Sequence, residues 1–77
     1  MKEYYEVLRD LREDREPKTN QKDIAEILGT TQQYYSEYEK GNRPLPIEHL
    51  ITLCKYYNVS ADYILGLPEN MPFPKRW

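Results

Sequence analysis

Two adjacent glutamines, Gln32 and Gln33, stand where a short helix is predicted to begin. Glutamine is not among the preferred helix caps, but its planar amide donates and accepts hydrogen bonds at the same time. In the major groove of DNA, such an amide can donate to N7 of adenine and accept from its N6 amino group. The neighbouring Thr31 could add a contact between its methyl group and that of thymine. The same residues would also suit an ordinary solvated helix face, so the surrounding elements must decide between the two interpretations.

The spacing of apolar residues predicts five short helices, and no segment has the alternation of a β-strand. We expect the helices at about residues 2–14, 21–28, 32–39, 47–57 and 61–65. Asn20, Thr31 and Ser60 are suitable N-caps, and a glycine follows the second, third and fifth helices. Short helices with brief connections predict a compact all-α domain.

The second and third predicted helices are joined by only three residues, Gly-Thr-Thr. So short a connection forces two helices to cross steeply, which is the helix-turn-helix arrangement. Ala25 provides the small side chain that such a crossing needs. On the third helix, Tyr35 and Tyr38 then face inward, and the polar side chains face outward. The outward set is Gln32, Gln33, Ser36 and Glu37.

Eight tyrosines are distributed over these helices. Helical phase places five of them toward the core, namely Tyr5, Tyr35, Tyr38, Tyr57 and Tyr63. The remaining three, Tyr4, Tyr34 and Tyr56, are predicted to be exposed.

The charge pattern argues mildly against strong non-specific attraction to nucleic acid. The formal net charge is −2, and residues 1–17 carry six acidic and four basic residues. Residues 18–43, which include both glutamines, carry four of each sign. Any DNA binding should therefore depend on specific contacts more than on bulk charge.

Other function classes find little support in the sequence. His49 and Cys54 are the only residues of their types, the glycines are isolated, and no metal-ligand spacing occurs. We therefore predict no enzyme, no cofactor and no metal, with His49 and Cys54 as structural positions on a helix. No apolar run approaches the roughly 20 residues of a membrane span. The N-terminus has no apolar signal-peptide core, and a single cysteine cannot form an internal disulfide, so we expect a cytoplasmic protein without membrane contact.

The segment NQKDIAEILGTTQQYYSEYEKGNRPLP resembles the Cro/C1-type helix-turn-helix family, also called the XRE family. LRDLRED is similar to the first helix of the family, and YYNVSADYILGL to its fourth-to-fifth helix junction, so the resemblance runs from about Tyr4 to Leu67. It implies a five-helix, lambda-repressor-like DNA-binding domain over residues 1–66, followed by an extended Pro-rich tail over residues 67–77. It also implies a transcriptional repressor that binds double-stranded DNA as a homodimer. The operator would be an inverted repeat, read in the major groove by the helix at residues 32–39.

The resemblance also implies roles for individual residues. The predicted base-reading residues are Thr31, Gln32, Gln33, Tyr34 and Glu37, and a carboxylate such as Glu37 could accept from cytosine N4. The predicted phosphate-contacting residues are Asn20, Gln21, Ser36, Lys40, Asn42 and Arg43. The sequence departs from the family pattern at Thr19 and Tyr35, where apolar aliphatic residues are usual, and the Tyr35 hydroxyl therefore needs water or a partner.

A second interpretation rests on the C-terminal segment. Three prolines in residues 67–77 exclude a long helix, yet the segment contains Leu67, Met71, Phe73 and Trp77. These apolar side chains could bind a protein partner, as in an antitoxin, form a dimer contact, or fold back on their own domain. An antitoxin-like or other protein-interaction module is therefore the alternative prediction.

Overall fold

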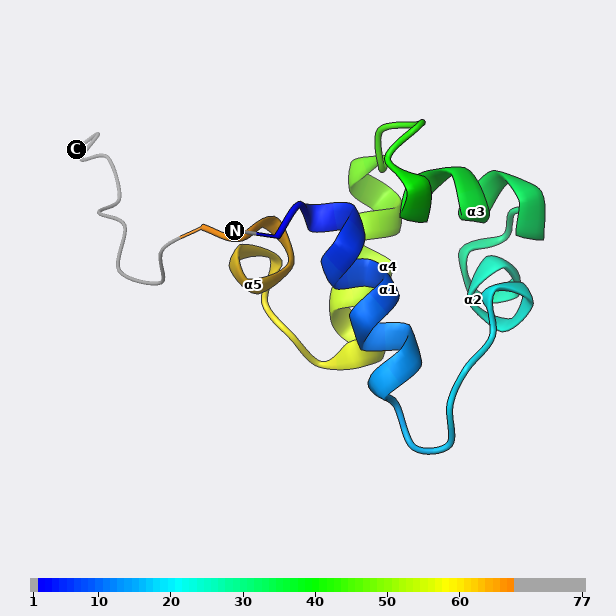
Figure 1. Ribbon diagram of the computed structural model, residues 1–77, viewed down its shortest axis with the longest axis horizontal. Coiled ribbons are helices and arrows are strands. Elements are labelled where there is room, and N and C mark those ends of the chain that lie inside the picture. Colours follow the sequence, from blue (N-terminus) through cyan, green and yellow to red (C-terminus); the bar gives the residue numbers. More distant parts are fainter. Residues whose placement is uncertain (1, 68–77) are drawn as a thin grey trace.

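The computed structural model describes residues 2–67, and this part of the chain contains five α-helices and no strand. The helices are α1 (Tyr4–Asp14), α2 (Gln21–Leu28), α3 (Gln32–Lys40), α4 (Ile47–Tyr57) and α5 (Ala61–Leu65) (Figure 1). The predicted bounds of α2, α4 and α5 are confirmed, α1 begins two residues later than expected, and α3 ends one residue later. The all-α, five-helix prediction is therefore confirmed. The Pro-rich tail lies, apart from Leu67, outside the described residues.

Local hydrogen bonds explain where the helices begin. The side chain of Asn20 accepts from the backbone N–H of Asp23 at 2.9 Å, and that of Thr31 from Tyr34 at 3.1 Å. Ser60 caps α5 in the same way. Each cap satisfies a backbone donor that has no partner within its own helix.

Gly41 ends α3 in the left-handed conformation, with φ of +78°. A side chain there would be strained, and a Cβ atom would come within 2.6 Å of the Tyr5 ring on α1. Gly29 ends α2 with a similar φ of +74°, but no atom lies within 4 Å of the corresponding Cβ position. Only Gly41 therefore combines a backbone requirement with a steric one.

The core is small and contains two aromatic residues from α3. Tyr35 and Tyr38 are almost completely buried and pack edge to face, with ring centroids 6.1 Å apart. They pack with buried side chains from all the other helices, namely Leu8, Ile24, Ala25, Leu53 and Ile64. Because both tyrosines point inward, the opposite side of α3 is left facing solvent.

Three predictions about other tyrosines are wrong. Tyr4, which we expected to be exposed, is partly buried and packs against the core. Tyr63 is 58% exposed, because the five-residue α5 directs Ile64, not Tyr63, into the core. Tyr56 is partly buried against the core, and the guanidinium of Arg15 lies 4.3 Å from the centroid of its ring. The loop after α1 supplies this cover, which helical phase alone does not predict.

No helix in the described part of the chain is both long enough and apolar enough to cross a membrane.

Candidate nucleic-acid interface

An open groove of about 490 Å³ follows the outer side of α3. In Figure 1, α3 lies along one edge of the molecule, with α2 below it and α5 at the opposite end. The side chains that line the groove come from α3, its N-cap and the loop that follows it. They are Thr31, Gln33, Tyr34, Ser36, Glu37, Lys40 and Arg43. Most of the predicted base-reading residues therefore share one surface with three of the predicted phosphate-contacting residues.

The first turn of α3 presents free amides. Gln32 and Gln33 are exposed, and neither side chain makes a hydrogen bond to another residue within the range 2–67. Gln33 lines the groove, whereas Gln32 is not among the residues that line it. The hydroxyl oxygen of Thr31 already accepts the N–H of Tyr34 as the cap of α3, which leaves its O–H and its methyl group for a partner. Among these three residues, only the two glutamines offer a whole side-chain amide that is free of contacts within the protein.

Tyr34 and Arg43 form one unit at the side of the groove. Tyr34 is 43% exposed, and its ring packs edge to face on buried Tyr38 with centroids 5.8 Å apart. The guanidinium carbon of Arg43 lies 4.5 Å from the centroid of the Tyr34 ring. Nη1 of Arg43 also donates a 3.3 Å hydrogen bond to the Tyr34 hydroxyl. The loop residue is thereby tied to the first turn of α3.

Glu37 and Asn42 form a second pair. Nδ2 of Asn42 donates to Oε2 of Glu37 at 2.7 Å, and the backbone N–H of Asn42 donates to the Glu37 carbonyl at 3.0 Å. Glu37 still has free lone pairs, since a carboxylate has about four acceptor positions. The loop after α3 is therefore fixed by the side chain that faces the groove.

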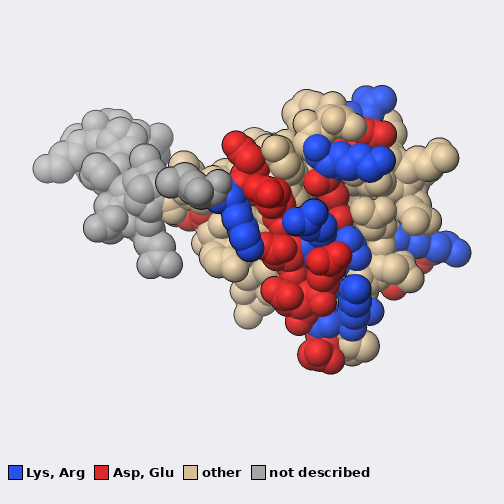
Figure 2. Space-filling model, viewed as in Figure 1, with Lys and Arg blue, Asp and Glu red and all other residues tan. Residues whose placement is uncertain are grey.

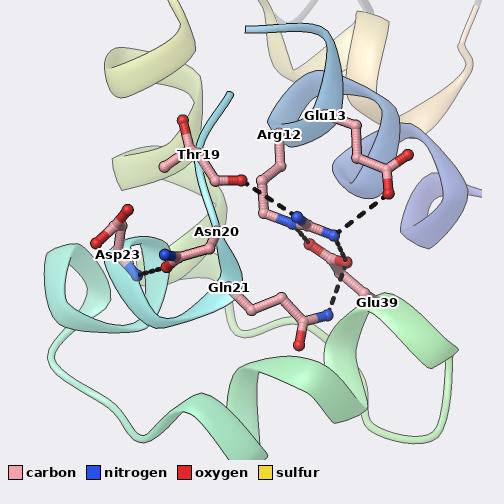
Figure 3. Close-up of polar contacts among 7 residues, drawn as sticks. All are labelled: Arg12, Glu13, Thr19, Asn20, Gln21, Asp23 and Glu39. Atoms are coloured by element: carbon pink, nitrogen blue, oxygen red, sulfur yellow. Dashed lines mark hydrogen bonds and ion pairs between the residues drawn. The ribbon is translucent and has the colours of Figure 1, made fainter. Parts of the chain in front are cut away.

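The two candidates at the start of α2 are both engaged in contacts within the protein. Asn20 caps the helix through its side-chain oxygen. Nε2 of Gln21 donates to Oε1 of Glu39 at 3.0 Å, so Gln21 points toward α3 (Figure 3). The amide oxygen of Gln21 has no partner among the described residues and stays available as an acceptor only.

Glu39 is the centre of a buried polar network that sequence reasoning missed. Arg12 of α1 makes two hydrogen bonds to its carboxylate, from Nε at 2.8 Å and from a terminal nitrogen at 2.9 Å. Arg12 also donates to the carbonyl of Thr19 at 3.2 Å, and its distance to the Glu13 carboxylate is 3.8 Å (Figure 3). The network therefore joins α1, the loop before α2, and α3.

A signal for this network was present in the sequence. Arg12 comes four residues after buried Leu8, and Glu39 four residues after buried Tyr35, so each has the phase of a core residue. Opposite charges at two inward-facing positions are rarely left unpaired in a folded protein. The pairing could therefore have been predicted, although its geometry could not.

The network sets the ionisation of its members. Burial opposes the charged form of Glu39, but the hydrogen bonds from Arg12 and Gln21 and the nearby Tyr35 hydroxyl outweigh it, so the pKa of Glu39 lies below its ordinary value. The hydrogen bond to Glu39 raises the pKa of Arg12. The Tyr35 hydroxyl is buried beside this carboxylate without an ordinary hydrogen-bond geometry, and burial together with the negative charge raises its pKa. The ion pair is thus intact at neutral pH.

Comparison with known protein families identifies the family to which this arrangement belongs. The helix-turn-helix family model matches residues 8–64, which include all of α2, α3 and α4. The chain belongs to the Cro/C1-type helix-turn-helix family. In this family, α2 and α3 are the two helices of the motif that the sequence predicted.

Relatives in Bacillus subtilis (strain 168) extend this finding. The uncharacterized HTH-type transcriptional regulator YobD is 38% identical over 72 residues, which cover 94% of this chain and 62% of the relative. The HTH-type transcriptional regulator ImmR is 41% identical over 49 residues, covering 64% of this chain and 39% of the relative. The uncharacterized HTH-type transcriptional regulator YqaE is 34% identical over 56 residues, or 73% of this chain and 48% of the relative. The chain thus spans from about two fifths to three fifths of the length of these relatives. No solved structure matches it.

The charge distribution separates the helix-turn-helix surface from α1. Figure 2 shows acidic side chains gathered over the middle of the molecule, where α1 lies in Figure 1. Acidic residues on α1 include Glu6, Asp10, Glu13 and Asp14. The groove on α3 contains one carboxylate, Glu37, and two cations, Lys40 and Arg43. A polyanion would therefore meet less repulsion at α3 than at α1.

Proposed function

We propose that this chain binds double-stranded DNA sequence-specifically and acts in transcription regulation, with α3 entering the major groove. One observation carries the proposal: the free amides of Gln32 and Gln33 lie at the exposed N-terminal end of the second helix of a helix-turn-helix. That end of the recognition helix is the part that contacts base edges in this motif. Membership of the family and the names of the three relatives support the same function.

Base reading would be divided among the residues of the first two turns of α3. Gln32 and Gln33 each suit the N6 and N7 positions of adenine. The methyl group of Thr31 and the ring of Tyr34 would make apolar contacts, the former with thymine. Glu37, oriented by Asn42, would accept from cytosine N4.

Phosphate contacts would flank these positions. Lys40 and Ser36 line the groove and offer a positive charge and a hydroxyl. Asn20 and Gln21 stand at the start of α2, where free backbone N–H groups and the helix dipole favour an anion. Asn42 would contact the backbone beyond α3. The sequence predicts the same role for Arg43, but the surroundings of this residue favour a different one.

The family further supports a repressor that binds as a homodimer to an inverted repeat. Two copies of α3 would then occupy half-sites about one helical turn apart. A net charge of −2 makes the non-specific attraction to DNA weak, so most of the sequence-specific binding would come from contacts of α3.

The structure offers no support for a catalytic cysteine. Burial raises the pKa of the Cys54 thiol, whereas a nucleophilic cysteine needs a lowered pKa, and we propose no catalytic role for it.

A binding selection tests this function. Purified protein is incubated with a random duplex DNA pool at about 0.1 M salt, and the retained DNA is sequenced. The salt concentration is fixed because phosphate contacts make the affinity salt-dependent, and variants can then be compared with the wild type. We expect a two-fold symmetric motif that loses its adenine positions in Gln32→Ala and Gln33→Ala variants. Lys55→Ala, exposed on α4 and outside the groove, is the control and should select the unchanged motif. A folded protein that enriches no motif would refute the proposal and favour the protein-interaction alternative.

A further inference from the structure

Arg43 belongs to the loop after α3, but its guanidinium lies against the first turn of that helix. It lies 4.5 Å from the centroid of the Tyr34 ring and donates to the Tyr34 hydroxyl at 3.3 Å. It also lines the groove that Gln33 and Glu37 line. The positive charge is therefore placed beside the predicted base-reading side chains.

The support under this guanidinium is rigid. The Tyr34 ring packs edge to face on Tyr38, which is 1% exposed and packs in turn on Tyr35 and His49. Stacking on an aromatic face and a hydrogen bond together restrict a side chain that otherwise has several free rotamers. Arg43 is thus pre-organised, so less conformational entropy is lost when it binds a planar partner.

The donors needed for such a partner remain free. A guanidinium has five N–H groups, and Tyr34 uses one of them. Within the described residues, no carboxylate lies within 4.0 Å of Arg43, so its charge is not neutralised by an ion pair. The fork formed by Nε and the other terminal nitrogen is available for a bidentate contact.

We propose that Arg43, held by Tyr34, reads a guanine through O6 and N7 in the major groove, which makes it a specificity-determining residue and not a phosphate contact. Two parallel N–H donors match the two acceptors of guanine, and this is the commonest specific contact of arginine with DNA. A phosphate contact requires the charge but not this orientation. The inference rests on the proposed function, since it assigns one base of the site that α3 would read.

Lysine at this position separates the two roles. Arg43→Lys keeps the positive charge that a phosphate contact needs but removes the stacked, bidentate fork. In the binding selection, we expect one guanine position per half-site to lose its preference in this variant. On a defined site, the affinity ratio between guanine and the other bases should fall by about 5- to 150-fold, the equivalent of 1–3 kcal/mol.

Variants of Tyr34 test the support independently. Tyr34→Leu removes the ring under the guanidinium and should weaken the same guanine position, whereas Tyr34→Phe keeps the ring and should preserve most of the preference. Circular dichroism and thermal melting of each variant check that the fold is intact. Tyr34 is 43% exposed and contacts the core only through its edge-to-face packing on Tyr38, so we expect both variants to fold.

Three results are decisive. Loss of one guanine position in both Arg43→Lys and Tyr34→Leu supports the assignment. An unchanged motif in Arg43→Lys, together with a salt slope that falls by about one in Arg43→Ala, identifies a phosphate contact and overturns it. If the folded wild-type protein enriches no motif at all, the proposed function itself is refuted. This outcome is distinct from a failure of the Arg43 assignment alone.

Discussion

Substitution of Glu39 by glutamine should destabilise the fold more than any surface change. The side chains of Arg12 and Glu39 are only 10% and 3% exposed, and the carboxylate accepts three hydrogen bonds, two from Arg12 and one from Gln21. Glu39→Gln keeps the shape but removes the negative charge. Its amide nitrogen would also face the Arg12 donors, leaving the buried guanidinium with only the more distant Glu13 carboxylate as a counterion.

The magnitude follows from this geometry. Breaking a buried ion pair by removing one partner costs about 3–5 kcal/mol. Arg12 keeps two other contacts, the carbonyl of Thr19 and, at 3.8 Å, the carboxylate of Glu13. We therefore expect a loss near the lower end, about 3 kcal/mol, from a total of about 4–12 kcal/mol for a domain of this length. The melting temperature should fall by more than about 10 °C.

Urea unfolding at pH 7, followed by far-UV circular dichroism, measures this loss. The double variant Arg12→Met, Glu39→Met is the matched control, because removing both charges leaves no unpaired buried ion. Its loss of unfolding free energy should be clearly smaller than the sum of the losses in the single variants Arg12→Met and Glu39→Met. A loss below about 1 kcal/mol for Glu39→Gln would show that the pair is effectively solvated and would refute the reasoning.

The same ion pair predicts the behaviour in acid. The pKa of Glu39 in the folded protein lies below its ordinary value of 4.5. As the pH falls below 4.5, Glu39 of the unfolded chain is protonated before Glu39 of the folded protein. The stability that this group contributes is therefore fully present above pH 4.5 and is lost as the pH falls through the lowered pKa of the folded state. Glu39→Gln should lose less stability than the wild type over this range.

Three further predictions concern the helix ends, the buried tyrosines and the groove. In urea unfolding, Gly41→Ala should lower the unfolding free energy by more than Gly29→Ala does, because only the new methyl group at position 41 clashes with the Tyr5 ring. Gly29→Ala carries only the left-handed strain of roughly 1 kcal/mol. Equal losses would contradict the steric clash. Burial raises the pKa of Tyr35 and Tyr57 above 10.0, so their contribution to stability is present below pH 10 and lost at higher pH. Phenylalanine at either position should reduce the loss of stability between pH 9 and pH 11, and an unchanged loss would contradict this origin. Glu37→Gln should bind non-specific DNA more tightly at low salt by fluorescence anisotropy, because a charge that repels phosphate is removed; weaker binding would mean that the carboxylate makes a favourable contact.

Much of the site followed from local sequence. The caps Asn20 and Thr31 and the glycines after α2 and α3 define the helix-turn-helix, since each acts on backbone groups within a few residues. The outward phase of the glutamines followed from the inward phase of Tyr35 and Tyr38. These features depend on sequence separations of four residues or fewer, which helix geometry specifies completely.

The partners of the polar side chains did not follow in this way. Gln21 bonds to Glu39 across 18 residues, Arg12 to Glu39 across 27, and Arg43 reaches back nine residues to Tyr34. Each contact depends on how two elements cross and on where a loop returns.

The amino-acid sequence by itself thus determined the five helices, the helix-turn-helix and the residue types on the outer side of α3. Only the tertiary structure decided which of those side chains are free, which are held by a neighbour, and which charges are buried together. The physical reason is the range of the forces involved: helix propensity and capping act within one or two turns. Side-chain hydrogen bonds and stacking instead require atoms from distant segments to meet within a few ångströms.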